Sequence, residues 1–227
     1  MREFSAKIVD VVDGKFLVFD ETYFYPVSGG QPSDTGRVKR KHDNKEFLVV
    51  NVKKGERGFV HEVDGEGLAP SDEVVATIDW PRRHKLMRSH TAAHIVSSII
   101  NKETGALITG NQLELDKVRI DFSLDEYDQA ALVKYLEQAN ETISRALPVT
   151  FTTIPREHAL QRPTLSKLAV GLPPSITEIR VVTIEGLDEQ ACGGTHVKNT
   201  AEIGPLEFVK AENKGAKNRR LYFRLKE

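Results

Sequence analysis

Four residues in two distant segments have the types and the spacing of a metal site. His90 and His94 are four residues apart in a segment with helical periodicity, so their rings project from one helix face about one turn apart. Cys192 and His196 follow much later, in the sequence Ala191-Cys192-Gly193-Gly194-Thr195-His196-Val197. A soft thiolate combined with imidazole nitrogens selects zinc over magnesium or calcium. We therefore predict one Zn²⁺ ion, bound by His90, His94 and Cys192 with His196 as the fourth candidate ligand.

The predicted zinc has two interpretations. A closed set of four ligands is typical of structural zinc, whereas a catalytic site keeps a position for water or substrate. We favour the open site, in which His196 binds weakly or leaves the metal to act near the substrate. Thr91 and Ala92 follow His90, so the Glu of a metalloprotease HExxH helix is missing and that class is disfavoured. The remaining histidines lack a matching partner and are interpreted as surface residues: His42, His61, His84 and His158.

The first 80 residues predict a small β-barrel or sandwich, because short β-type runs alternate there with turn signals. Asp13-Gly14 is a typical hairpin turn, and both Gly193-Gly194 in the metal loop and Gly29-Gly30 offer positive φ or a close backbone approach. The charge-rich stretch 37–45 is interpreted as a solvated loop or hairpin end. The strands expected in this half are Ala6–Val12, Lys15–Asp20, Glu46–Val52, Gly58–Val63 and Glu73–Ile78.

The pattern changes at Asp79-Trp80-Pro81, where Pro81 suits the first turn of a long helix. A capping box at Ser123–Glu126 predicts the start of a second helix, which ends before Pro148. Further strands are expected at Val118–Phe122, Val149–Thr153, Glu178–Ile184, Leu206–Ala211 and Arg220–Arg224. The predicted fold is therefore α+β in two domains: a small N-terminal β-barrel at 1–80, then an α+β domain at 81–227 with helices on a largely antiparallel sheet.

Composition limits the environment and the partners. A single cysteine excludes an intramolecular disulfide, and the lack of a signal-like or membrane-spanning apolar run indicates a cytoplasmic protein without membrane insertion. With 32 basic and 33 acidic residues the chain is nearly neutral, yet residues 210–227 hold seven basic residues and two acidic ones. That excess predicts contact with nucleic-acid phosphates, and the alternative is a solvated strand edge protected by Lys and Arg.

Four motifs together resemble a known family. The chain is similar to the editing domain of alanyl-tRNA synthetase and to its free-standing relatives, the AlaX-type trans-editing proteins, over nearly its whole length. Ala201 is a mild departure, since the family often has glycine there. The motifs are the arginine-rich approach to HxxxH at 79–94, the strand-to-helix segment 116–123, the Cys-Gly-Gly-Thr-His segment 192–205 and the glycine-rich segment 24–36.

The resemblance implies a zinc-dependent hydrolase that deacylates mischarged alanine tRNA, carrying serine or glycine. The chain begins at the barrel and shows no ATP-binding domain, which implies a free-standing protein of the medium-length class rather than a synthetase. The editing domain of threonyl-tRNA synthetase has a similar metal constellation, but the barrel argues against it. Two other classes stay open: a non-catalytic tRNA-binding zinc module, and a zinc hydrolase for a small ester or amide.

The resemblance also suggests where substrate and tRNA bind. A small polar side chain that hydrogen-bonds the serine hydroxyl would reject alanine. The candidates are Thr109, Asn111 and Gln112, in a predicted turn, and Gly29, Gly30 and Gln31. For both groups the alternative is an ordinary polar or glycine-requiring turn. The candidate tRNA contacts are Lys217, Arg219 and Arg220.

Overall fold

The computed structural model describes residues 1–162, 165 and 176–226. The chain forms two compact units, 1–85 and 86–227. The mixed α and β content and the N-terminal barrel confirm the predicted fold class, whereas a two-domain arrangement with a boundary at residue 80 stays a prediction. Among the described residues, no helix is long and apolar enough to cross a membrane.

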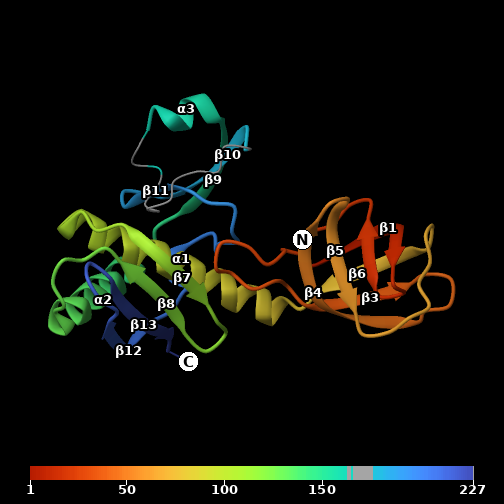
Figure 1. The fold of residues 1–227 in the computed structure, drawn as a ribbon, viewed down its shortest axis with the longest axis horizontal. Helices are drawn as coiled ribbons and strands as arrows, with labels where there is room; N and C mark the ends of the chain where they lie inside the picture. Colours follow the sequence, from red (N-terminus) through yellow and green to blue (C-terminus); the bar gives the residue numbers. More distant parts are fainter. Residues whose placement is uncertain (163–164, 166–175, 227) are drawn as a thin grey trace. The chain divides into compact units, whose positions relative to one another are not determined.

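Unit 1 is a closed barrel of six antiparallel strands in the order β1-β2-β5-β4-β3-β6 (Figure 1). Alternate residues point inward, as expected for strands with one buried face. The Asp13-Gly14 turn between β1 and β2 is confirmed, and both residues have positive φ. The strands are β1 (Glu3–Val12), β2 (Phe16–Phe19), β3 (Gly36–Arg40), β4 (Glu46–Gly55), β5 (Gly58–Val63) and β6 (Glu73–Ile78).

One expectation for unit 1 is confirmed in part and another is wrong. Residues 41–45 are the solvated hairpin end between β3 and β4 that was one of the two interpretations, whereas residues 37–40 belong to strand β3, because Val38 is fully buried in the barrel. His61 is a core residue rather than a surface one. Its Nε2 lies 2.8 Å from Thr22 Oγ1 and its Nδ1 3.2 Å from the carbonyl oxygen of Leu17, so its polar atoms are satisfied inside the barrel.

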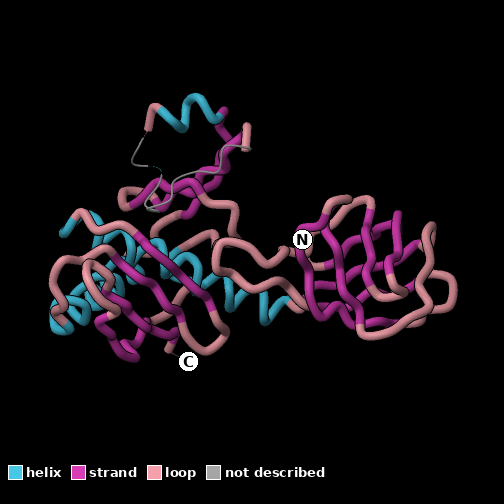
Figure 2. The backbone as a smooth tube through the Cα atoms, in the orientation of Figure 1, coloured by secondary structure: helices cyan, strands magenta, loops and turns pink. Residues whose placement is uncertain are grey.

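Unit 2 contains two antiparallel sheets, which Figure 2 shows as separate groups of strands. The four-stranded sheet has the order β12-β13-β8-β7 and shares one apolar core with helices α1 (Trp80–Thr104) and α2 (Gln129–Ser144). The three-stranded sheet has the order β11-β10-β9, and a smaller core lies between it and helix α3 (Arg156–Leu160). The strands are β7 (Ile108–Leu113), β8 (Val118–Phe122), β9 (Val149–Pro155), β10 (Glu178–Ile184), β11 (Asp188–Ala191), β12 (Leu206–Asn213) and β13 (Arg219–Leu225).

The start of α2 differs from the prediction. Asp128, and not Ser123, is the N-cap residue, because its Oδ1 accepts hydrogen bonds from the N–H groups of Ala130 and Ala131 at 2.8 and 3.2 Å. Ser123 instead accepts a hydrogen bond from the Leu107 N–H at 2.8 Å, and its own N–H binds the Leu107 carbonyl oxygen. Ser123 therefore continues the pairing beyond the end of β8 and does not cap α2.

Helix α1 is buried on all sides along its middle. Every residue from Ser89 to Ile100 is buried, which places His90 and His94 in the interior of unit 2. A helix buried all round lies in a core rather than on a surface. Polar side chains at such positions need partners, so the histidines of α1 are expected to face other polar groups.

Candidate metal centre

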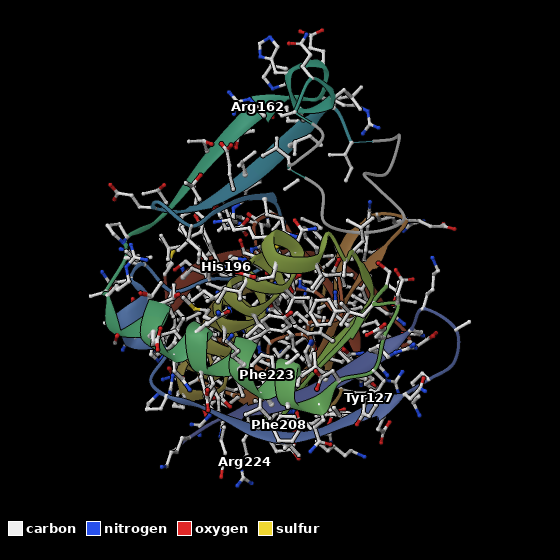
Figure 3. The ribbon with its side chains drawn as sticks, turned by 90° about the vertical axis from the view of Figure 1, so that its left-hand side faces the viewer. Tyr127, Arg162, His196, Phe208, Phe223 and Arg224 are labelled. Atoms are coloured by element: carbon white, nitrogen blue, oxygen red, sulfur yellow. The ribbon has the colours of Figure 1, made fainter. Side chains whose placement is uncertain are left out.

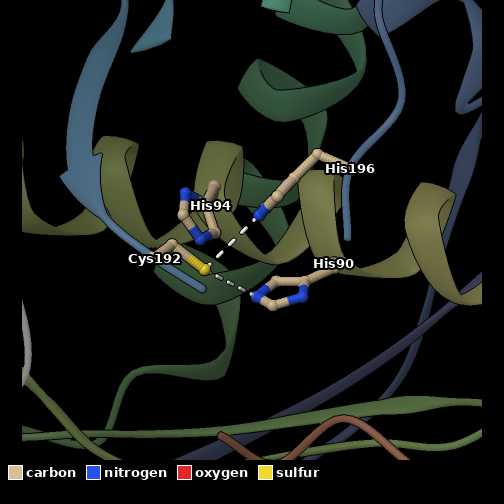
Figure 4. Close-up of side chains that lie close together, drawn as sticks. All are labelled: His90, His94, Cys192 and His196. Carbon is tan, nitrogen blue, oxygen red and sulfur yellow. Dashed lines mark hydrogen bonds between the residues drawn. The ribbon is translucent and has the colours of Figure 1, made fainter. Parts of the chain in front are cut away.

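Figure 4 shows the four predicted ligands converging on one point. Their ligand atoms all lie within 4.8 Å of one another. Cys192 Sγ is 3.5 Å from Nε2 of His90 and 3.4 Å from Nε2 of His196. The three imidazole rings have centroid separations of 4.4 to 5.2 Å. Two residues from α1 and two from the loop after β11 therefore meet as predicted.

The donor set fits zinc in chemistry and in spacing. Sulfur and nitrogen ligands at about 2.3 and 2.0 Å from a tetrahedral ion are about 3.5 Å from each other. The two sulfur-to-nitrogen distances, 3.5 and 3.4 Å, match that value. The cluster could therefore bind a metal ion, and its three imidazoles and one thiol are a set that zinc prefers.

The loop that carries Cys192 and His196 is held by the three-stranded sheet. The Cys192 N–H donates to the Arg180 carbonyl oxygen at 3.0 Å, which extends the pairing of β11 with β10 by one residue. The Arg180 guanidinium in turn donates to the carbonyl oxygens of Cys192 and Gly194, both at 2.8 Å. One side chain thus ties both ends of the Cys192–Gly194 turn to β10.

The positive φ that was expected at Gly193 and Gly194 is not found. Neither Gly193 nor Gly194 has a positive φ. Gly194 is required by space, because a Cβ built there would overlap the His90 ring. Its N–H also donates to Cys192 Sγ at 3.3 Å. The close backbone approach predicted for this turn is therefore confirmed at Gly194.

Thr91 sets the tautomer of His196. The Thr91 hydroxyl donates its single hydrogen to the Met87 carbonyl oxygen at 3.0 Å. It can then only accept from His196 Nδ1, which lies 3.1 Å away, and from the Val197 N–H at 3.3 Å. Nδ1 of His196 consequently carries the proton, and the lone pair of Nε2 points to Cys192 and the centre of the cluster. Partners of this kind commonly orient metal-binding histidines.

Asp188 is placed behind His94. Its carboxylate oxygen lies 3.8 Å from His94 Nδ1, and both side chains are buried. This separation is beyond hydrogen-bonding distance, so the carboxylate is a buried acidic group close to the ring rather than a hydrogen-bond acceptor that fixes it. His196, in contrast, is oriented by its hydrogen bond with Thr91, a group outside the cluster.

Burial controls the protonation of the cluster. It lowers the pKa of the His90 and His196 imidazoles well below their usual range, and neighbouring positive groups lower both further. Burial also raises the pKa of the Cys192 thiol, and the Gly194 N–H and the Arg180 guanidinium offset that only in part. The imidazoles are therefore neutral at neutral pH, which is their metal-binding form, while the thiol ionises when a cation is bound.

The predicted glycine-rich segment forms a tight turn in unit 1. Gly29 and Gly30 have φ of 57° and 81°, and Ser28 and Gln31 exchange backbone hydrogen bonds across them. Gln31 is fully buried. The buried Asp34 carboxylate anchors this segment, because it accepts hydrogen bonds from Arg83 Nε at 2.7 and 2.8 Å and from the Tyr25 N–H at 2.6 Å. The glycines are thus required by backbone conformation, and a substrate role for the segment stays a prediction.

The predicted turn at Thr109–Gln112 is instead strand β7, a correction caused by its pairing with β8. A bulge at Thr109 turns its hydroxyl to Asn218 Oδ1 at 3.4 Å. Asn111 pairs with Ile120, a core residue, and lies on the same face as the buried Leu113. Gln112 is exposed on the opposite face. The three residues therefore do not line one site together.

The three predicted tRNA contacts differ in how far they are available to a ligand. Arg219 is buried, and its guanidinium binds Asn213 Oδ1 at 3.1 Å and the carbonyl oxygens of Gly215 and Asp125. Arg220 forms a bidentate ion pair with Asp121 at 2.6 and 2.8 Å. Lys217 is 74% exposed and pairs with the equally exposed Asp125 at 3.0 Å. Arg224 on the same hairpin projects outward from its sheet (Figure 3). Two of the three predicted residues thus have internal structural contacts.

Sequence reasoning missed three residues that lie around the ligands: Thr91, Asp188 and Arg180. Thr91 lies within the HxxxH element, so its place between the two histidines is a local signal for a supporting role. Asp188 and Arg180 have no local signal, because only the pairing of β10 and β11 and the packing against α1 bring them to the cluster.

Both parts of the chain match known proteins. Residues 179–222 match a family described as the threonyl and alanyl tRNA synthetase second additional domain, and residues 1–82 match tRNA synthetases class II (A). The chain is 48% identical to the alanyl-tRNA editing protein AlaX-M of Methanosarcina barkeri, over 99% of this chain and 95% of that protein. It is 40% identical to the protein of that name from Saccharolobus solfataricus, over 100% and 95%.

A third relative is larger. The chain is 38% identical to the alanine–tRNA ligase of Pyrobaculum calidifontis, where the match covers 93% of this chain but only 24% of the ligase. The AlaX-M proteins, in contrast, match along almost their whole length. This protein belongs to the family of alanyl-tRNA editing proteins of the AlaX-M type.

Proposed function

We propose that this protein is a trans-editing hydrolase that removes serine from mischarged alanine tRNA, with zinc at the cluster of His90, His94, Cys192 and His196. Editing proteins of this family are aminoacyl-tRNA deacylases, so the chain is an enzyme. The observation that carries the proposal is the set of three buried imidazoles and one half-buried thiol, whose ligand atoms lie within 4.8 Å of one another, in a chain that matches AlaX-M relatives over 99% of its length.

The reaction is hydrolysis of the ester between the amino acid and the terminal ribose of tRNA. Water adds to the acyl carbon, the bond to the ribose oxygen breaks, and this oxygen takes up the proton that the water loses, which regenerates the ribose hydroxyl. Zinc bound here would polarise the carbonyl, hold the amino group or lower the pKa of a bound water. The chain itself orients Nε2 of His196 through Thr91 and fixes the Cys192–Gly194 turn through Arg180.

We propose Asn111 as the residue that discriminates serine from alanine. Both charged tRNAs present the same phosphates and bases, so the difference must be read by a group next to the amino acid. Asn111 is half-buried and lies on the core face of β7, whereas Gln112 is exposed on the other face. If the Asn111 amide binds the serine hydroxyl, then bound alanine, which has no hydroxyl, leaves the amide without this hydrogen bond. The lost hydrogen bond would weaken binding of the alanine ester by about 1–3 kcal/mol. Thr109 and the turn at Gly29 to Gln31 are the next candidates.

We also propose that tRNA phosphates contact the basic hairpin of β12 and β13. Lys217 is our candidate there, because its ion pair with Asp125 is exposed and worth little against a phosphate. Arg219 and Arg220 support the hairpin through their internal contacts.

The decisive experiment is deacylation of alanine tRNA charged with serine, glycine or alanine by the purified protein. We expect multiple-turnover hydrolysis of the serine ester, with the alanine ester spared. A zinc module that only binds tRNA would show no turnover, which would refute the proposal. A hydrolase for small esters would show no salt dependence of substrate affinity, because it would bind no phosphates.

Asn111→Leu should lower the ratio of kcat/KM for the serine ester to kcat/KM for the alanine ester. Gln112→Ala, on the opposite face of β7, is the matched control and should leave this ratio unchanged. An unchanged ratio in Asn111→Leu would assign the discrimination to another residue.

A further inference from the structure

An exposed aromatic ring lies beside the metal centre and has no role in the mechanism above. Phe151 on β9 is 40% exposed, and its ring centroid is 6.4 Å from that of His196. The carbon of the Arg180 guanidinium lies 4.4 Å from the centroid of the same ring. A single exposed apolar side chain is ordinary, so what distinguishes Phe151 is its place between His196 and the Arg180 guanidinium.

Strand pairing places this ring on the face of the sheet that carries the cluster. Phe151 lies opposite Val182, and Thr153, two residues along the same face of β9, lies opposite Arg180. The N–H of Cys192 in turn pairs with the carbonyl of Arg180. Phe151, Arg180 and Cys192 therefore share one face, while Ile154, Ile179 and Val181 point to the other face and pack under α3.

The ring is also held in place. Val182 opposite it is fully buried in the main core, and Arg180 contacts it while bridging the carbonyl groups of Cys192 and Gly194. A rigid aromatic ring backed by a guanidinium is the kind of surface on which proteins stack unpaired nucleic-acid bases. On the neighbouring part of β9, residues 150–153 are all exposed, so the ring is accessible from this side.

The chemistry of the substrate accounts for the position of the ring. In an aminoacyl-tRNA the amino acid is esterified to the terminal ribose, so the terminal base is only one ribose away from the carbonyl that reacts. When that carbonyl is at the cluster, the base is therefore within about one ribose of the histidines. Phe151 is at such a distance from His196.

We propose that Phe151, backed by Arg180, is the stacking platform for the terminal base of the aminoacylated RNA. This inference rests on the proposed function and adds the part of the substrate that the site reads beyond the amino acid. The platform contacts a flat base face, so it holds the ester at the metal centre without reading the tRNA sequence.

The test compares two small esters that differ only in the base. One is adenosine carrying serine on its 2′ or 3′ oxygen, and the other is the same seryl ester of methyl riboside, which has no base. For the wild type we expect kcat/KM to be about 5- to 150-fold higher with adenosine, the range for one base stacked on an aromatic ring. Phe151→Ala should abolish this ratio, and Phe151→Trp should retain it.

The controls separate stacking from damage to the fold. Phe151→Ala should keep its zinc content and its rate on the ester without a base. Val209→Ala, another exposed apolar residue of unit 2 at 41%, should behave as wild type on both esters.

Two results would overturn the inference alone: equal loss on both esters in Phe151→Ala, or no loss on either, while the wild type deacylates seryl-tRNA. If the wild type hydrolyses no seryl ester and no seryl-tRNA, the proposed function fails and this inference fails with it.

Discussion

Removing the Thr91 hydroxyl tests how the metal centre is oriented. Thr91→Val keeps the shape of a fully buried side chain but deletes the acceptor for His196 Nδ1 at 3.1 Å and for the Val197 N–H at 3.3 Å. Two buried donors then lack this partner, and each costs about 1–3 kcal/mol. We expect the free energy of unfolding to fall by about 2–6 kcal/mol. Zinc affinity should fall by about 10- to 100-fold, the usual effect of losing a group that orients a ligand.

Thr91→Ser is the matched control, because it keeps the hydroxyl and removes only a methyl group. Zinc affinity is measured by competition with a chromophoric chelator, and stability by urea unfolding of the zinc-free protein. If the hydroxyl orients His196, Thr91→Val should have a much lower zinc affinity and a much lower free energy of unfolding than Thr91→Ser. Equal zinc affinity in the two variants would refute it and would show that the orientation of His196 is set by packing alone.

Three further predictions use other parts of the chain. Cys192→Ala should lose zinc and most deacylation, and full activity in this variant would show that the thiolate is dispensable. Burial lowers the pKa of His61 to about 4 from its usual 6.5, so the unfolded chain binds the proton first as the pH falls. Stability should therefore drop between pH 6.5 and pH 4, and His61 should contribute on the order of 3 kcal/mol to that drop. Urea unfolding should show a drop smaller by about this amount in His61→Gln than in the wild type, because the buried His90 and His196 contribute in both proteins. Lys217→Ala should weaken tRNA binding and lower the salt slope by about one, whereas Lys134→Ala on α2 should change neither, and a slope unaffected by Lys217→Ala would remove it from the interface.

Much of the site was predictable from the sequence because its signals are local. The spacing of His90 and His94 fixes both rings on one helix face wherever that helix lies, and Cys192 and His196 share one short turn. Strands β5, β6, β8 and β10 have the predicted bounds, since their alternating or continuous apolar pattern reflects directly which side is buried. The chemistry of the two residue pairs was enough to predict that they form one candidate metal site.

What the sequence left open depends on contacts between distant segments. Gly36–Arg40 and Ile108–Leu113 have few apolar residues, and they are strands because neighbouring strands supply their hydrogen bonds. In the sequence, Arg219 and Lys217 are both basic residues of the same segment. The fold buries Arg219 and exposes Lys217, so only the charge of Lys217 is available to a phosphate. Likewise Phe151 and Arg180 acquire a position beside His196 only through the pairing of β9 with β10. Local patterns specify which chemistry a residue can perform, and tertiary packing decides which of its neighbours it meets and whether solvent or substrate can reach it.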